Sequence, residues 1–238
     1  MESRKKGLLY LIPSLIGSSN ADYAIPRDVI EISGKLKYFI VENERSARRY
    51  LKLVKKEIII DELKFLVYDE HTHKTGLEEY LTPALNGNDT GLLSEAGCPA
   101  VADPGSEIVR LAHAMNIRVV PLTGPSSVVL ALMASGLNGQ NFLFTGYLPV
   151  KRNERIAAVR KLEQRSVTTG QTQIFIETPY RNNQLLSDLL STCQPSTFLC
   201  IASELTTHTE FIMTQKICDW TGNLPDLNKK TAIFLIGK

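Results

Sequence analysis

The sequence lacks the features that most directly assign a compartment. None of its apolar runs approaches the ~20 residues that span a membrane, and residues 1–6 lead into a short strand rather than the apolar core of a signal peptide. The four cysteines show neither CxxC pairing nor regular spacing, which favours free thiols over disulfides or a zinc site. We therefore expect a soluble, cytoplasmic protein.

The common nucleotide and metal motifs are also absent. The first strand is not followed by GxGxxG, and neither GxxxxGK[ST] nor HExxH occurs, so NAD, P-loop nucleotide and zinc-hydrolase chemistry lose support. His71 and His73 could ligate a metal, but they have no companion ligands, and solvated or hydrogen-bonding histidines fit better. We expect no metal site.

Two loops rich in glycine and proline lie within residues 92–135, each before a predicted helix. The first runs from Ser94 to Gly105, where Asp103 and Pro104 have the character of a helix N-cap and first helical residue. The second runs from Pro121 to Ser127. Such loops at the carboxyl ends of strands are where open α/β sheets bind ligands, although ordinary strand-to-helix connections have the same composition.

Strand and helix patterns alternate along the chain, which predicts an α/β protein with mixed, largely parallel sheets. Strands are expected at 8–12, 38–41, 58–60, 63–68, around 92, and at 117–120, 142–145, 172–176, 198–202, 211–214 and 232–236. Of the two runs 58–60 and 63–68, the second could instead be a helical turn. Helices are expected at 26–34, 43–55, 75–87, 104–115, 126–134, 153–165, 181–191 and 215–220. The sharp turn at Pro121 predicts two α/β domains, residues 1–121 and 122–238.

Charge is distributed in blocks although the net charge is only +2. Residues 37–56 hold seven basic side chains against two acidic ones, and residues 151–165 hold six against two. Residues 57–107 hold eleven acidic side chains against two basic ones. Such blocks suit a protein that presents basic surface to phosphates near a site that is not itself basic, and solvated helix faces are the alternative.

The amino-acid sequences of the two loops resemble motifs of the tetrapyrrole methylase superfamily. SEAGCPAVADPG followed by PLTGPSSVVLALMASG is similar to the family motifs SDAGTP..SDPG and PGPSA..AL..SG, and the branch it resembles most methylates a ribose 2'-hydroxyl of small-subunit ribosomal RNA. The resemblance continues in FLFTGYLPVKRNER, IFIETPYR and SELTTHTEF and covers most of the chain from residue 90 onward. The sequence ends at Lys238, short of the extra carboxyl-terminal domain that many ribosomal RNA members carry.

This resemblance implies a cofactor, S-adenosylmethionine (AdoMet), held in a cleft between the two domains mainly by backbone groups. The methyl group of a sulfonium is already activated, so the transfer needs alignment of the reactants rather than a metal. By position in the family motifs, the implied cofactor-binding residues are Pro13, Ser94, Gly97, Cys98, Val101, Ala102, Ser126, Ser127, Tyr147, Leu148, Glu177, Thr178, Leu205, Thr206, Thr231 and Ala232.

The acceptor side follows from the same resemblance. A ribose hydroxyl must lose a proton as it attacks, so Glu42 and His71 are the candidate catalytic residues, because VENERSARR and VYDEHTH stand where the family has AEDTRHT and SYHEHNE. A surface polar role is the alternative for both. Basic residues hold phosphates, and the candidate substrate-binding residues are Arg45, Arg48, Arg49, Glu70 and Arg181.

Departures from the family motifs keep other functions open. The amino-terminal TPIGNLGDIT appears only as IPSLIGSSNADYAIP, and Cys98, Tyr180 and Thr207 replace a threonine, a histidine and a lysine of the motifs. The leading hypothesis is an AdoMet-dependent methyltransferase acting on RNA, as a homodimer like its relatives. The alternatives are a methyltransferase for a small tetrapyrrole-like or other metabolite, and a module that binds AdoMet or RNA without turnover.

Overall fold

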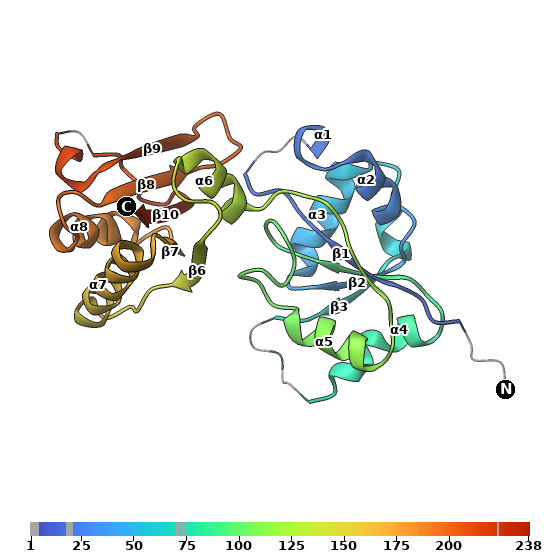
Figure 1. Ribbon diagram of the computed structural model, residues 1–238. Coiled ribbons are helices and arrows are strands. Elements are labelled where there is room, and N and C mark those ends of the chain that lie inside the picture. The colour runs from blue at the N-terminus through green and yellow to red at the C-terminus, as the bar shows by residue number, and fades with distance from the viewer. Residues whose placement is uncertain (1–4, 18–20, 70–71, 73–74, 223) are drawn as a thin grey trace. The chain divides into compact units, whose positions relative to one another are not determined.

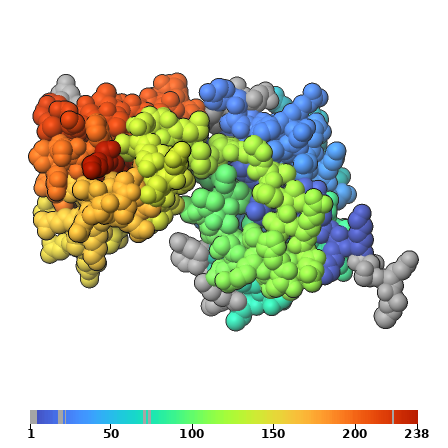
Figure 2. Space-filling view, in the orientation of Figure 1, coloured from blue at the N-terminus to red at the C-terminus, as the bar shows by residue number. Residues whose placement is uncertain are grey.

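The computed structural model describes residues 5–17, 21–69, 72, 75–222 and 224–238, and the chain forms two compact units (Figure 1). Unit 1 comprises residues 1–126 and unit 2 residues 127–238, whereas the sequence places the boundary at Pro121. The space-filling view shows that side chains fill the gaps between the ribbon elements within each unit (Figure 2). No helix in the described part of the chain is long and apolar enough to cross a membrane.

Unit 1 is built on a parallel five-stranded sheet. Its strands, in spatial order, are β3 (Lys64–Val67), β2 (Tyr38–Val41), β4 (Thr90–Leu93), β1 (Leu9–Ile12) and β5 (Val119–Pro121). All four pairings are parallel, and Thr90 of the central strand β4 is in register with both Leu9 and Tyr38. All five strands therefore end at the same edge of the sheet, here called the carboxyl edge of unit 1.

Helices cover both faces of this sheet. One face packs Ile12, Phe39 and Leu93 against α2 (Arg27–Ser33) and α3 (Glu44–Val54). The other face packs Leu9, Ile40 and Leu92 against η2 (Leu77–Leu81), α4 (Thr82–Leu85) and α5 (Ser106–Ala114). The short elements α1 (Ala21–Ala24) and η1 (Ile60–Glu62) complete the unit. The chain leaves β1 and β2 toward one face and β4 toward the other, which opens a crevice at the end of β4.

Unit 2 is built on a mixed five-stranded sheet. Its strands, in spatial order, are β6 (Phe142–Tyr147), β7 (Thr172–Ile176), β10 (Ala232–Gly237), β8 (Phe198–Ser203) and β9 (Phe211–Lys216). Only β6 and β7 pair in parallel, because β10 inserts antiparallel between β7 and β8, and β9 returns antiparallel beside β8. The predicted α/β class with mixed sheets is confirmed, and the parallel pairs predominate in unit 1.

The core of unit 2 lies between this sheet and two helices, α7 (Arg152–Thr169) and α8 (Asn182–Thr192), where the rings of Phe175 and Phe234 stack with their centroids 6.1 Å apart. Helix α6 (Ser127–Ser135) packs on β8, β9 and β10. Arg155 is buried within this core and donates to Asp188 of α8 at 2.6 Å.

Most predicted elements are present, and four local predictions are wrong. No strand forms at 58–60, because the chain turns into η1 at Ile60. The helix expected over 75–87 is replaced by η2 and α4, because Gly76 adopts a left-handed conformation (φ +81°) and Pro83 has no N–H for the helix interior. Asp103 is not an N-cap, because α5 begins at Ser106 after Gly105. Strand β9 extends through Lys216, which leaves only the turn η3 (Ile217–Asp219) where a helix was expected. The predicted cap of α3 is confirmed: the Asn43 side chain accepts from the Ser46 N–H at 3.1 Å.

Candidate functional site

Three chain segments meet at the carboxyl edge of unit 1. The segment after β1 pairs with the segment after β4, because Ser14 N–H donates to Gly97 C=O at 2.9 Å and Gly97 N–H donates to Ser14 C=O at 3.3 Å. The segment after β5 joins them where the Cys98 thiol lies 3.4 Å from the Pro125 carbonyl oxygen. The structure thus brings together four predicted cofactor residues of unit 1: Pro13, Ser94, Gly97 and Cys98.

Two glycines allow this close approach of backbone segments. Gly97 has φ +77°, and a Cβ there would lie 3.2 Å from Ile16 Cγ2. A Cβ on Gly124 would lie only 2.1 Å from Pro13 Cγ, far inside van der Waals contact. Gly124 is therefore a site residue that the sequence-based prediction misses, although the Gly–Pro pair after a predicted strand is the signal that could have identified it.

The loop between Gly97 and α5 is conformationally unusual. Ala100 and Ala102 both have φ +62°, a region that residues other than glycine rarely occupy, and Gly105 has φ +128°. Val101 is exposed between the two alanines. Local backbone strain of this kind clusters at ligand sites, so the geometry suits the predicted cofactor roles of Val101 and Ala102. Ser126, also a predicted cofactor residue, is the last residue of unit 1 and half-buried.

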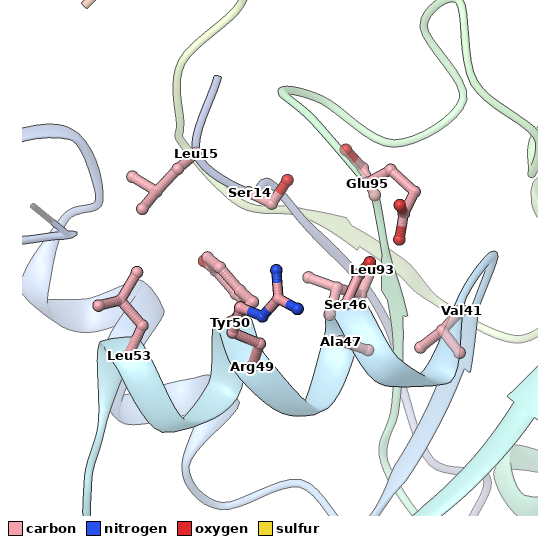
Figure 3. Close-up of a pocket in the computed structure, with 11 residues that line it drawn as sticks. Ser14, Leu15, Val41, Ser46, Ala47, Arg49, Tyr50, Leu53, Leu93 and Glu95 are labelled. Atoms are coloured by element: carbon pink, nitrogen blue, oxygen red, sulfur yellow. The ribbon is translucent and has the colours of Figure 1, made fainter. Parts of the chain in front are cut away.

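A cavity of about 240 Å³ opens at the ends of β1, β2 and β4, with α3 as its floor (Figure 3). Its polar lining consists of three serine hydroxyls, one guanidinium and one carboxylate. Its remaining walls are apolar side chains and Tyr50. The lining residues are Ser14, Leu15, Val41, Ser46, Ala47, Arg49, Tyr50, Leu53, Leu93, Ser94 and Glu95.

Two carboxyl groups near this cavity are electrostatically perturbed. Burial raises the pKa of Asp103, although the Ser94 hydroxyl and the amides of Ala96 and Glu95 act in the opposite direction. Burial and the negative charge of Asp103 also raise the pKa of Glu95, against the opposing effect of the Ser46 hydroxyl. Perturbed acids beside a cavity are a signature of functional sites, and sequence reasoning assigned a site role to neither residue.

Tyr50 links α3, which forms one wall of the cavity, to the segment after β1. Its hydroxyl donates to the Pro13 carbonyl oxygen at 2.8 Å and thereby ties α3 to the segment after β1. Burial raises the pKa of Tyr50 above its usual range, so the hydroxyl stays a neutral donor. This buried bond therefore helps to hold α3 beside the cavity.

The basic residues of α3 differ in what they contact. Arg48 pairs with Glu44 at 2.7 Å, lies 3.6 Å from Asp61 and covers the Phe65 ring, so intramolecular contacts occupy it. Arg49 lines the cavity and has no ion-pair partner within the described ranges. Arg45 is exposed. Arg49 is thus the predicted phosphate ligand that the structure leaves available at the cavity.

Of the two predicted catalytic residues, Glu42 and His71, the structure describes only Glu42. Glu42 follows β2 directly and is half-buried, but it is not among the residues that line the cavity. His71 and Glu70 lie outside the described residues. The roles of all three remain predictions.

Unit 2 gathers its predicted site residues at one edge by a different arrangement. Because β10 is antiparallel to β7 and β8, its first residue lies at the edge where β6, β7 and β8 end. Here Leu148, Glu177, Leu205 and Ala232 are buried, Thr178 and Thr206 are half-buried, and Tyr147 and Thr231 are exposed. Ser127, the remaining predicted residue, begins α6. This edge, with the loops that follow it, is here called the ligand edge of unit 2.

Side-chain carboxylates cross-link the ligand edge. Glu204, at φ +52°, accepts from the Thr231 N–H at 2.8 Å and from the Thr231 hydroxyl at 3.1 Å. The buried Glu177 accepts from the Thr178 N–H at 2.7 Å and from Arg181 at 2.6 Å. Arg181, predicted to bind substrate, therefore has a structural partner within its own unit.

Buried polar atoms without a hydrogen-bond partner are concentrated at these two edges. Among the described residues there are eight such side-chain atoms, and five of them lie at or beside the predicted site: Ser14 Oγ, Asp103 Oδ2, Glu177 Oε2, Arg181 Nε and Asn182 Oδ1. Buried polar atoms nearly always have partners, so these five indicate that a polar ligand or ordered water completes them. The described residues contain no cluster of His, Cys, Asp and Glu side chains that could hold a metal.

The chain is similar to known proteins in sequence and in fold. The family model for Tetrapyrrole (Corrin/Porphyrin) Methylases matches residues 38–219. Ribosomal RNA small subunit methyltransferase I from Escherichia coli O157:H7 is 31% identical over 201 residues, which cover 84% of this chain and 66% of that protein. The protein of the same name from Buchnera aphidicola subsp. Schizaphis graminum is 28% identical over 236 residues, covering 98% of this chain and 78% of that protein.

The crystal structure of the methyltransferase CobJ has the same fold, with a TM-score of 0.63 over 97% of this chain and 94% of CobJ at 16% sequence identity. The fold and the family model agree with the resemblance seen in the two glycine loops. The chain therefore belongs to the tetrapyrrole methylase family, and the recognition made from its sequence is confirmed.

Proposed function

We propose that the chain is an AdoMet-dependent methyltransferase whose acceptor is a ribose 2'-hydroxyl of small-subunit ribosomal RNA. The observation that carries this proposal is the alignment of 98% of the chain with a relative named as a ribosomal RNA small subunit methyltransferase. The basic helix α3 beside the cavity of unit 1 supports an acceptor that carries phosphates.

The chemistry of the two edges supports AdoMet as the cofactor. AdoMet carries an ammonium group, a carboxylate, ribose hydroxyls and an adenine ring, which can complete unpartnered atoms such as Glu177 Oε2 and Ser14 Oγ. When bound, it supplies an activated methyl group. In this proposal the loop Ser94–Ala102 of unit 1 and the residues of the ligand edge of unit 2 hold it.

The residues of the chain then have three tasks. The backbone of the glycine loops orients the donor, the cavity orients the acceptor, and a basic group removes the proton of the hydroxyl. None of these tasks requires a metal ligand. A homodimer remains part of the proposal and is testable by the solution mass of the purified protein.

Transfer of a labelled methyl group tests the proposal directly. The protein would be incubated with labelled AdoMet and, in parallel, with small ribosomal subunits, naked total RNA and a tetrapyrrole mixture. Label in ribosomal RNA, recovered after digestion as a 2'-O-methylnucleoside by mass spectrometry, is the expected result. Label in the tetrapyrrole fraction alone would favour methylation of a small tetrapyrrole-like substrate. We test this alternative because the description of the family names tetrapyrrole methylases. AdoMet binding without transfer to any acceptor would favour a non-catalytic module.

A further inference from the structure

The cavity of unit 1 contains both groups that ribose methylation requires of the acceptor side. We propose that this cavity receives the acceptor nucleotide, that Glu95 takes the proton from its 2'-hydroxyl, and that Arg49 binds the adjacent phosphate. The inference rests on the proposed function for the methyl donor. It adds to that function the place where the acceptor binds and the residue that acts as general base.

The position of Glu95 in the chain supports this role. Glu95 directly follows Ser94, within the same loop whose Gly97 pairs with Ser14 and whose Cys98 approaches Pro125. A carboxylate at this position is part of the predicted cofactor loop itself. Figure 3 shows Glu95 entering the cavity from the end of β4 and Arg49 entering it from α3.

The size of the cavity favours part of a nucleotide over a macrocycle. Sites for drug-sized ligands have volumes of ~300–1,000 Å³, and this cavity measures about 240 Å³. It accommodates a ribose and a phosphate, with the base outside, but not a whole tetrapyrrole. Its serine hydroxyls and apolar walls offer hydrogen bonds and contact surface to a sugar, while the guanidinium of Arg49 offers charge to a phosphate.

The local electrostatics suit proton abstraction. Among the described residues, the charged or titratable groups near Glu95 are Asp103 on its own loop and Arg49 and Tyr50 on α3. Burial and the charge of Asp103 raise the pKa of Glu95, and a carboxylate with a raised pKa is a stronger base. Tyr50 stays neutral and does not compete for the proton.

The step balances without a further reactant. The 2'-oxygen forms a bond to the methyl carbon as the carbon–sulfur bond breaks, with its electron pair remaining on sulfur. The hydroxyl proton passes to the Glu95 carboxylate and then to water. The products are a ribose methyl ether, a neutral thioether and one released proton.

The test of the base compares Glu95→Gln with Glu42→Gln, the alternative base from the sequence, and with Glu62→Gln, an exposed acid on η1, as control. Glu95→Gln should lower single-turnover methylation of ribosomal RNA by roughly 10²- to 10⁴-fold and leave AdoMet affinity within a few-fold. The rise of the wild-type rate with pH through the pKa of Glu95 should vanish. Carbon-13 NMR of the glutamate carboxyls, recorded without cofactor, identifies the Glu95 signal as the one missing from Glu95→Gln. In the wild type this signal should titrate with a pKa above the ordinary range for glutamate.

The test of the phosphate contact is RNA binding at several salt concentrations without cofactor. Arg49→Gln should flatten the slope of log affinity against log salt by ~0.7, the value for one phosphate contact on a single strand. Lys52→Gln, on the same helix but outside the cavity, is the matched control and should leave the slope unchanged.

The outcomes separate this inference from the proposed function. If the wild type methylates RNA and Glu95→Gln is as fast as Glu62→Gln, the inference alone is overturned. It is also overturned if Glu42→Gln, rather than Glu95→Gln, removes the pH dependence, or if Arg49→Gln leaves the salt slope unchanged. A wild type that binds AdoMet but methylates no RNA overturns the proposed function, and this inference with it. Circular dichroism and melting of each variant exclude loss of fold as the cause.

Discussion

The two units place their predicted ligand residues at a sheet edge in different ways. In unit 1 every strand is parallel, so the segments after β1, β4 and β5 leave the sheet at the same edge, and Gly97 and Gly124 let them approach closely. In unit 2 three of the four pairings are antiparallel, and the residues meet only because β10 runs against β7 and β8, so that Thr231 lies beside Glu204. A parallel sheet thus gathers the predicted ligand residues of unit 1, and a mixed sheet gathers those of unit 2.

The chemistry of the edges differs as well. The carboxyl edge of unit 1 has an open cavity and two acids, Glu95 and Asp103, whose pKa values are raised. At the ligand edge of unit 2, the acids Glu177 and Glu204 are occupied by hydrogen bonds to Arg181 and Thr231. Under the proposed function, this contrast suits unit 1 to proton exchange and unit 2 to holding a ligand.

The largest effect is expected from the buried ion pair that holds unit 2 together. Arg155 and Asp188 are almost fully buried and share bonds of 2.6 and 2.9 Å, so Asp188→Asn would leave a buried guanidinium without its counter-charge. Breaking a buried pair by removing one partner costs ~3–5 kcal/mol. Trp220, the single tryptophan, is buried in unit 2, and its fluorescence during urea unfolding would measure the loss. A change below ~1 kcal/mol would mean that packing, not this pair, fixes α7 against α8.

Substitution of Gly124 should weaken both the stability of unit 1 and its cofactor binding. The Cβ of Gly124→Ala would displace Pro13, and overpacking of this kind costs ~1–3 kcal/mol. We expect AdoMet affinity, measured calorimetrically, to fall by about 10- to 100-fold, because the displaced segment pairs with the cofactor loop. Gly139→Ala is the control, since its Cβ would meet nothing within 4 Å. Equal affinity in the two variants would remove the segment after β1 from the cofactor site.

A smaller effect is expected from the ligand edge of unit 2. Thr231→Val removes the hydroxyl bond to Glu204 but keeps the backbone N–H bond and the side-chain shape. The loss of one such bond costs ~1 kcal/mol, so AdoMet affinity should fall about five-fold with little change in melting temperature. Affinity equal to that of the wild type would show that Thr231 does not help to hold the cofactor.

The smallest difference concerns acid sensitivity, and it should have opposite signs in the two units. Burial acts to raise the pKa of Asp188, but its bonds to Arg152 and Arg155 prevail and lower it, so the stability it contributes is present above the unfolded pKa and is lost as pH falls through the folded pKa. Glu95 and Asp103 have raised pKa values, so their contribution to stability rises as pH falls through the folded pKa. Hydrogen exchange from pH 6 to pH 2, corrected for the intrinsic rate, covers the window below the ordinary pKa of Asp188 and should therefore show protection lost first in α8. Earlier loss in α5 would reverse the comparison.

The sequence predicted the fold class and the family because those depend on local patterns. The structure contains the predicted alternation of strands and helices and the Asn43 cap, both of which depend on local sequence. The motifs of the glycine loops are local as well, and the family model matches them. The antiparallel insertion of β10 was not predicted, because strand order depends on packing between residues far apart in the sequence. The same holds for Gly124, whose importance comes from contact with Pro13 across the sheet.

The candidate site was predictable in part for the same reason. Ser94 and Gly97 stand in a motif, but the direction of the Glu95 side chain between them depends on a loop with several positive φ angles, which sequence patterns do not determine. Asp103 followed the pattern of an N-cap, yet Gly105 delays the start of α5 and leaves its carboxyl beside Ser94 and Glu95. The basic helix α3 was predicted as a block, and only the structure separates the occupied Arg48 from Arg49.

The proposed function assigns AdoMet-binding residues to the sheet edges of both units. Backbone amide NMR during titration with AdoMet, in the presence of a chelator, tests it most directly. We expect saturable shifts in both units, at Ser94–Cys98 in unit 1 and at Thr178, Thr206 and Thr231 in unit 2, with Gly7 and Asn88 at the opposite edge of the unit 1 sheet unchanged. Shifts confined to one unit, or no saturable shift at millimolar AdoMet, would contradict it.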